Sequence, residues 1–106
     1  MAKYMIQASY TSDGLKGLLK DGGSGRRKAV DDLLASVGGK VESFYYGFGD
    51  VDAFVIVDVP DNVSAAAVAL TVGASGAVTL RTTVLMTPEE VDQATKKSPA
   101  YRAPGA

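Results

Sequence analysis

The chain has 106 residues, which is room for one hydrophobic core and one domain. Its net charge of −1 argues against a nucleic-acid binder, because such proteins carry a broad basic field. Too few lysines and arginines cluster for a helix that lies on a membrane surface. Cysteine and histidine are both absent, which removes the usual zinc and haem ligands and the commonest proton shuttle. We therefore expect no bound metal and no cofactor.

The same features bear on location. Met1–Tyr4 runs directly into a strand pattern, without the charged and apolar leader of a secreted protein. A small secreted domain would often carry disulfides, and this chain has no cysteine to form them. We therefore expect a cytoplasmic protein.

The first half of the chain alternates strand and helix patterns. Lys3–Tyr10 places apolar and aromatic residues at every second position, which predicts a strand. Two apolar stripes at helical spacing follow, and the glycines of residues 22–25 separate them. We expect one kinked helix whose two segments face the same sheet and which ends at Gly38. Val41–Phe48 is rich in aromatic residues and predicts a second strand.

The second half continues with a strand, a helix, a strand, a short helix and a tail. Their expected ranges are 53–59, 63–73, 77–86, 88–97 and 98–106. Asn62 is the expected cap of the longer helix, and Thr87 with Glu90 forms a capping-box pattern around Pro88. The βαββαβ order predicts an α+β, ferredoxin-like fold with an antiparallel four-stranded sheet plus a C-terminal helix. The expected domain covers residues 1–97, and residues 98–106 form a proline-containing tail.

The third expected strand carries a clue to assembly. Residues 53–57 are apolar at every position, whereas a strand with one solvated face should alternate. Helices cover one face of such a sheet, so a second copy is expected to pack on the open face and make a homodimer. The alternative is an exposed apolar patch on a monomer.

The longer helix of the second half also lacks a polar face. Residues 64–72 carry no charge, although a helix on a protein surface normally shows a charged side. We expect the C-terminal tail or another subunit to cover its outer side. The alternative is that small alanines are tolerated at an exposed surface.

Four segments carry a resemblance to a known family. They are the strand Tyr4–Thr11, Gly38-Gly39-Lys40, Gly49-Asp50-Val51-Asp52 and residues 74–78. From Lys3 to about Glu90 the chain resembles the GYD domain family of small bacterial proteins, within the dimeric α/β-barrel group of ferredoxin-like folds. Gly49 and Asp52 match the signature G-x-Y-D, while Val51 stands in place of its tyrosine. The resemblance implies the fold and a dimer, and it supplies no catalytic residues.

The glycine-rich segment is a candidate anion site. Glycines before a helix start direct backbone N–H groups at an anion, and Ser24, Arg26 and Arg27 lie there. Cations in a first helical turn oppose the helix dipole, which is a reason to suspect a function. The alternative is a solvated face on which Arg27 pairs with Asp31 and Lys28 with Asp32.

Aromatic residues supply a second candidate site. Tyr10, Tyr46 and Phe48 are expected to line a ligand pocket between sheet and helices, or the dimer face. The alternative is an ordinary aromatic core. The aspartates around the third strand are expected to serve turns and caps rather than a metal, since they lie at opposite ends of that strand.

These features leave three functional hypotheses. The first is a small homodimeric ligand-binding or accessory domain. The alternative is a cofactor-independent dimeric-barrel enzyme, an oxygenase or isomerase, acting on a small aromatic or apolar substrate. The third is an anion-sensing regulatory domain that uses Arg26 and Arg27. A closed cavity lined by tyrosine would favour the enzyme, and a filled core would favour the binding domain.

Overall fold

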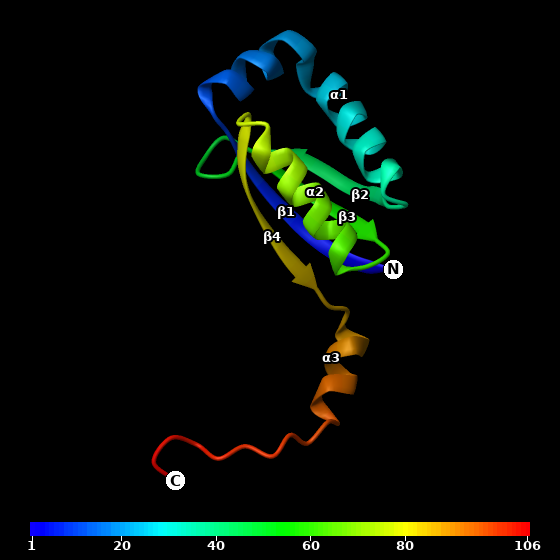
Figure 1. The fold of residues 1–106 in the computed structure, drawn as a ribbon, viewed down its shortest axis with the longest axis vertical. Helices are drawn as coiled ribbons and strands as arrows, with labels where there is room; N and C mark the ends of the chain where they lie inside the picture. Colours follow the sequence, from blue (N-terminus) through cyan, green and yellow to red (C-terminus); the bar gives the residue numbers. More distant parts are fainter.

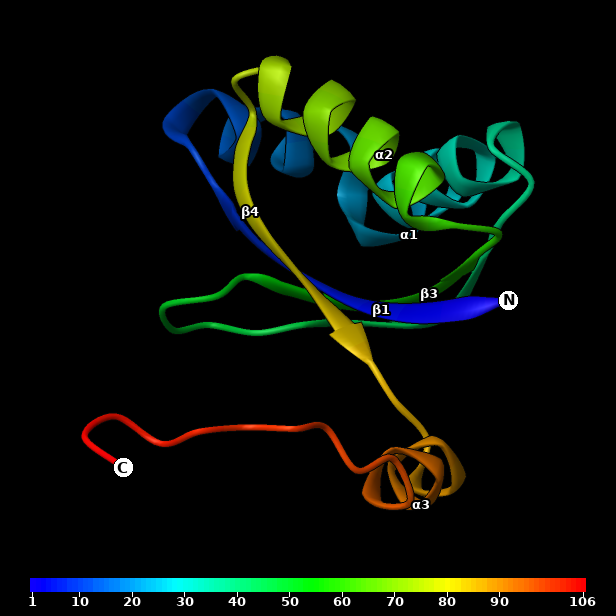
Figure 2. The same cartoon turned by 60° about the horizontal axis from the view of Figure 1, so that its bottom comes forward.

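A computed structural model describes all 106 residues and contains one sheet and three helices. The elements are β1 (Ala2–Tyr10), α1 (Ser12–Ser36), β2 (Lys40–Tyr46), β3 (Ala53–Val59), α2 (Asn62–Ala74), β4 (Val78–Leu85) and α3 (Pro88–Thr95). The strands pair antiparallel in the order β2-β3-β1-β4, which places β1 and β3 at the centre. Helices α1 and α2 lie over one face of the sheet (Figures 1 and 2). The expected α+β, ferredoxin-like fold with a C-terminal helix is confirmed.

The core lies between the sheet and its two helices. Val57 and Val59 of β3 and Leu34 of α1 are fully buried, and Tyr4 of β1 packs against them. The alternate residues of β3 lie on the opposite face, which we call the open face because no helix covers it (Figure 2). The two sides of β3 are therefore both apolar, as its sequence predicts, but only one is covered within the chain.

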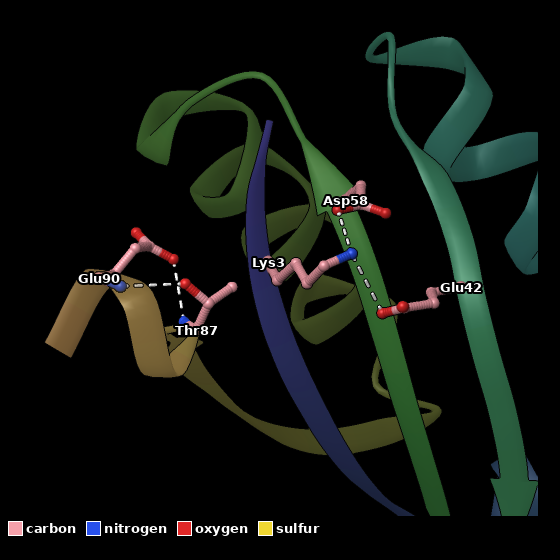
Figure 3. A network of polar contacts seen from close by, with 5 residues as sticks. All are labelled: Lys3, Glu42, Asp58, Thr87 and Glu90. Atoms are coloured by element: carbon pink, nitrogen blue, oxygen red, sulfur yellow. Dashed lines mark hydrogen bonds and ion pairs between the residues drawn. The ribbon is translucent and has the colours of Figure 1, made fainter. Parts of the chain in front are cut away.

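A charged network crosses the open face at one end (Figure 3). The Lys3 ammonium lies 2.9 Å from Oδ1 of Asp58 and 3.3 Å from Oε2 of Glu42. The hydrogen bond to Asp58, together with the charge of Glu42, raises the pKa of Lys3. Asp58 is only 6% exposed, so the pairing with Lys3 compensates the loss of water around its carboxylate.

Helix α1 is broken where the glycines predict. Gly22 has φ 75° and ψ 167°, outside the helical region, and separates two segments. The second segment packs on the core through Val30 and Leu34. The first segment meets the sheet through the buried Gly14. Its Leu15 and Leu19 are exposed, so the expectation that its leucine stripe faces the sheet is wrong. The extended backbone at Gly22 changes the direction of the chain, so the apolar residues before and after it no longer lie on one side of a continuous helix.

The start of α2 differs from the expectation by one residue. Asp61, not Asn62, caps the helix, and its carboxylate accepts a hydrogen bond of 2.8 Å from the Ser64 backbone. That bond lowers the pKa of Asp61. Asn62 instead accepts a hydrogen bond from the Tyr4 hydroxyl, which ties α2 to β1. Two adjacent residues with capping side chains compete here, and tertiary contact decides between them.

The C-terminal segment does not cover α2. Helix α3 and the tail project from the end of β4, on the open-face side of the sheet, whereas α2 lies on the other side (Figure 2). Ala66, Ala67 and Leu70 of α2 are exposed within the chain. None of the three helices combines the length and the apolar character that crossing a membrane requires.

Candidate functional site

A cavity of about 330 Å³ lies between the sheet and the two covering helices. Of its 21 lining residues, 15 are hydrophobic. They come from all four strands and from α1 and α2, and include Ala8 and Tyr10 on the sheet side and Val30 and Val72 on the helices. The cavity therefore lies in the same layer, between sheet and helices, as the hydrophobic core.

The cavity exists because α1 is held at its two ends and broken between them. At the first end, Thr11 donates a hydrogen bond of 2.9 Å to the carbonyl of Ala77, just before β4. Gly14 packs so closely there that a Cβ would lie 1.9 Å from the Ala77 oxygen. At the other end, Leu34 is buried in the core. The break at Gly22 lets the middle of α1 arch over the end of the sheet (Figure 1).

The polar residues of the cavity gather on its exposed rim. Asp13, Asp21 and Arg26 come from α1, and Ser75 follows the end of α2. Arg26 pairs with Asp21 at 3.7 Å, so the rim offers a compensated charge pair and one further carboxylate. The interior is apolar apart from the tyrosine of β1. This arrangement suits a molecule whose body is apolar and whose end reaches a polar rim.

Tyr10, Tyr46 and Phe48 do not share one pocket. Tyr10 lines the large cavity, while Tyr46 and Phe48 line a smaller neighbouring hollow with Leu15 and Leu18 of α1. Strand β2 ends at Tyr46, two residues before the expected end, so Phe48 lies in a loop and is fully exposed.

Tyr46 stands beside the break of α1 and links it to the sheet. Its hydroxyl donates a hydrogen bond of 3.0 Å to the carbonyl of Gly23. Partial burial, and then the neighbouring Tyr10, raise the pKa of Tyr46. Its ring packs against Phe44 with centroids 5.0 Å apart. At neutral pH the phenol therefore keeps its proton and acts as a hydrogen-bond donor.

The residues of the candidate anion site lie in the second segment of α1. Arg26 pairs with Asp21, and Arg27 pairs with Asp31 at 3.3 Å while its guanidinium lies over the Phe44 ring. Lys28 likewise pairs with Asp32 at 3.3 Å. An anion would have to displace carboxylates from these cations. Anion binding at Ser24, Arg26 and Arg27 stays a prediction.

Asp52 has a structural role in the loop between β2 and β3. Its carboxylate accepts a hydrogen bond of 2.8 Å from the backbone of Tyr10, and its own N–H donates to the carbonyl of Ala8 at 2.9 Å. Its carbonyl accepts a third bond from Gly47. Asp52 therefore fixes the loop against the end of β1, beside the cavity.

The sequence pointed to tyrosines, but the small residues are what open the cavity. Ala8, Ala53 and Ala77 line it from the sheet side, where larger side chains would fill it. These three alanines, each in a different segment, were the signal that the sequence offered. No group of three or more carboxylates comes together in a way that could hold a metal ion.

Comparison with known proteins adds the family and nothing more specific. A search of curated proteins and a search of solved structures give no match to this chain. The model of the GYD domain matches residues 4–95, which span all four strands, α1, α2 and α3. The chain therefore belongs to the GYD domain family.

Proposed function

We propose that this protein is a small homodimeric ligand-binding domain that holds an apolar molecule in the cavity between sheet and helices. The observation that carries the proposal is the cavity of about 330 Å³, most of whose lining is hydrophobic. Ligand pockets of proteins start at about this size and share this mostly apolar lining with a few polar groups.

The apolar lining of the cavity favours a ligand over water. The cavity opens to solvent at its rim, so water enters it when no ligand is bound. Water finds few hydrogen-bond partners on such an apolar lining. An apolar ligand that displaces such water gains binding energy from the hydrophobic effect.

The cavity is open at its rim and Tyr10 is the one tyrosine that lines it, so it is neither the closed, tyrosine-lined cavity expected of the enzyme nor a filled core. The chemistry around the cavity favours binding over catalysis. The raised pKa of Tyr46 keeps its phenol protonated at neutral pH, which removes it as a general base. Arg26 is already paired with Asp21, so it is not free to stabilise a developing negative charge. Tyr10 and Arg26 therefore serve to line the cavity, and Tyr46 supports the helix beside it.

The homodimer is part of the same proposal. Met5, Phe54 and Ile56 lie together on the open face, each half-buried, with no helix above them. A second copy would cover both sheets at once, since a two-fold axis brings identical faces together. The proposal also places the protein in the cytoplasm, because the chain has no cysteine for the disulfides that small secreted domains often carry.

The first test is mass spectrometry of the purified protein under native conditions. We expect a mass in excess of the polypeptide that disappears when the protein is denatured. Its fragmentation identifies the retained molecule directly. A ligand composed mainly of charged groups would contradict the proposal.

The second test uses the neutral fluorescent probe N-phenyl-1-naphthylamine and a matched pair of variants. Ala8→Leu places extra methyl groups in the cavity, while Gln7→Leu puts the same side chain on the open face of the same strand. We expect the wild type to bind one probe per chain, and Ala8→Leu to weaken binding at least about tenfold. Gln7→Leu should bind like the wild type. Equal binding by both variants would refute the cavity as the site.

A further inference from the structure

The C-terminal arm, residues 87–106, is well specified as structure but packs on nothing in its own chain. We propose that this arm is exchanged between two copies. The arm of each protomer then packs against the body of its partner, by which we mean residues 1–86. The inference rests on the proposed homodimer and extends it to a part of the chain outside the sheet.

The sequence specifies α3 strongly. The Thr87 hydroxyl accepts a hydrogen bond of 3.1 Å from the Glu90 backbone, and the Glu90 carboxylate accepts one of 3.0 Å from the Thr87 N–H (Figure 3). Pro88 occupies the first turn, where its fixed φ favours the helix. A helix of eight residues is nevertheless well below the roughly 12–15 residues that isolated helices need in water. Such a helix depends on packing contacts.

The body of the same protomer does not provide those contacts. Every residue from 88 to 106 is exposed, including the apolar Val91 at 47% and Tyr101 at 78%. The radius of gyration is 16.9 Å, against about 13 Å for a compact chain of this length. The arm is the part that extends the molecule (Figure 1).

The direction of the arm points to a second copy as its partner. It leaves the end of β4 and runs on the open-face side of the sheet, away from α1 and α2 (Figure 2). That is the side on which a second copy would pack. A two-fold axis would make the exchange reciprocal, with each arm lying along the other protomer.

Unpaired charges of opposite sign lie on the open face and on the first turns of α3. Arg81 lies on the open face opposite Gln7 and forms no ion pair within its chain. Glu89 and Asp92, on the first turns of α3, also have no cation partner. In the exchanged dimer, these carboxylates would be able to pair with Arg81 of the other protomer.

Isotope-coded cross-linking of the wild-type protein tests the exchange. Unlabelled and ¹⁵N-labelled chains are refolded together and treated with an amine-reactive cross-linker, which reaches Lys96 and Lys97 of the arm. Exchange predicts cross-links between the arm and lysines of the body that join one light and one heavy peptide. Cross-links that join only peptides of the same isotope would show that the arm packs on its own chain, and would overturn the proposal.

A pair of variants measures what the arm contributes. Val91 and Ala94 share one side of α3, whereas Gln93 lies on the opposite side. Val91→Asp should raise the dimer dissociation constant at least about tenfold in sedimentation equilibrium, while Gln93→Asp should change it less than about threefold. Equal effects of both substitutions would refute a packed apolar side of α3.

Amide hydrogen exchange separates failure of the arm from failure of the dimer. Residues 88–97 should be protected at high protein concentration and should lose protection on dilution below the dissociation constant. A dimer whose arm exchanges as fast as a free peptide would overturn the inference and leave the homodimer standing. A wild type that is monomeric at micromolar concentration would overturn both.

Discussion

The hydroxyl of Tyr46 hydrogen-bonds the carbonyl of Gly23, one residue after the break in α1. This contact joins β2 to the point where α1 changes direction, and both residues line the smaller hollow. A Cβ at Gly23 would lie 3.2 Å from the Tyr46 ring, so the helix and the ring are already in close contact. The position of the arch over the sheet therefore depends on this pair.

Replacing Tyr46 with Phe removes the hydrogen bond and keeps the ring. We expect Tyr46→Phe to lower the free energy of unfolding by about 0.5–1 kcal/mol, because the bond is partly solvated. Amide exchange should accelerate in residues 15–25. Tyr45→Phe is the control, since Tyr45 is 71% exposed on the other face of the same strand. Equal stability losses for both substitutions would show that the Gly23 contact has no special role.

Gly22 should resist substitution by alanine. Its φ of 75° and ψ of 167° lie in a region that side chains rarely adopt, although no atom would contact the new Cβ. Gly22→Ala should therefore cost about 1–3 kcal/mol through backbone strain alone. Chemical denaturation measures the loss. A variant as stable as the wild type would mean that α1 can straighten at this point without penalty.

Substitution by alanine at two other glycines of α1 should change the free energy of unfolding in opposite directions. Gly14→Ala places a Cβ against the backbone oxygen of Ala77, so we expect a loss of at least about 2 kcal/mol. A Cβ at Gly17 would have no atom within 4 Å. Gly17→Ala should therefore raise the free energy of unfolding by about 0.5–1 kcal/mol through helix propensity. The comparison of their melting temperatures checks both. The contact at Gly14 would be refuted if the two variants shifted in the same direction.

The cap of α2 makes stability depend on pH. The folded pKa of Asp61 is lowered by the hydrogen bond from Ser64, so its contribution is complete above the unfolded pKa of about 4. The contribution is lost as the pH falls through the lower, folded value. Asp61→Asn keeps a capping oxygen that does not titrate.

Melting temperatures from about pH 6 to about pH 2 test this cap. We expect Asp61→Asn to be less stable than the wild type at the upper end of this pH range. The difference in stability should shrink as the pH falls. A difference that stays constant across this range would contradict the lowered pKa of Asp61.

The order of elements follows from local signals in the sequence. Alternation in β1, the continuous apolar run of β3, the glycines at residues 22–25 and the capping box at Thr87 each act over a few residues. Together they predicted the ferredoxin-like order, the position of the helix break and the start of α3. They also marked β3 as a strand with two apolar faces.

The candidate site was only partly predictable. Tyr10 lines the large cavity, but Tyr46 and Phe48 belong to the smaller hollow, because β2 ends at Tyr46 and the chain turns away. The choice of Asp61 over Asn62 as a cap likewise followed from the contact between Asn62 and Tyr4, 58 residues apart in sequence. No local pattern contains such contacts.

The sequence by itself determined which segments are strands and helices, since propensity, capping and periodicity act between near neighbours. Only the tertiary structure decided that α1 arches over a cavity and that the arm leaves on the open side of the sheet. Both depend on where distant segments meet: Gly14 against Ala77 at one end of the arch, and Leu34 in the core at the other. The space left between those contacts is set by the path of the whole chain, so it appears only once the chain has folded.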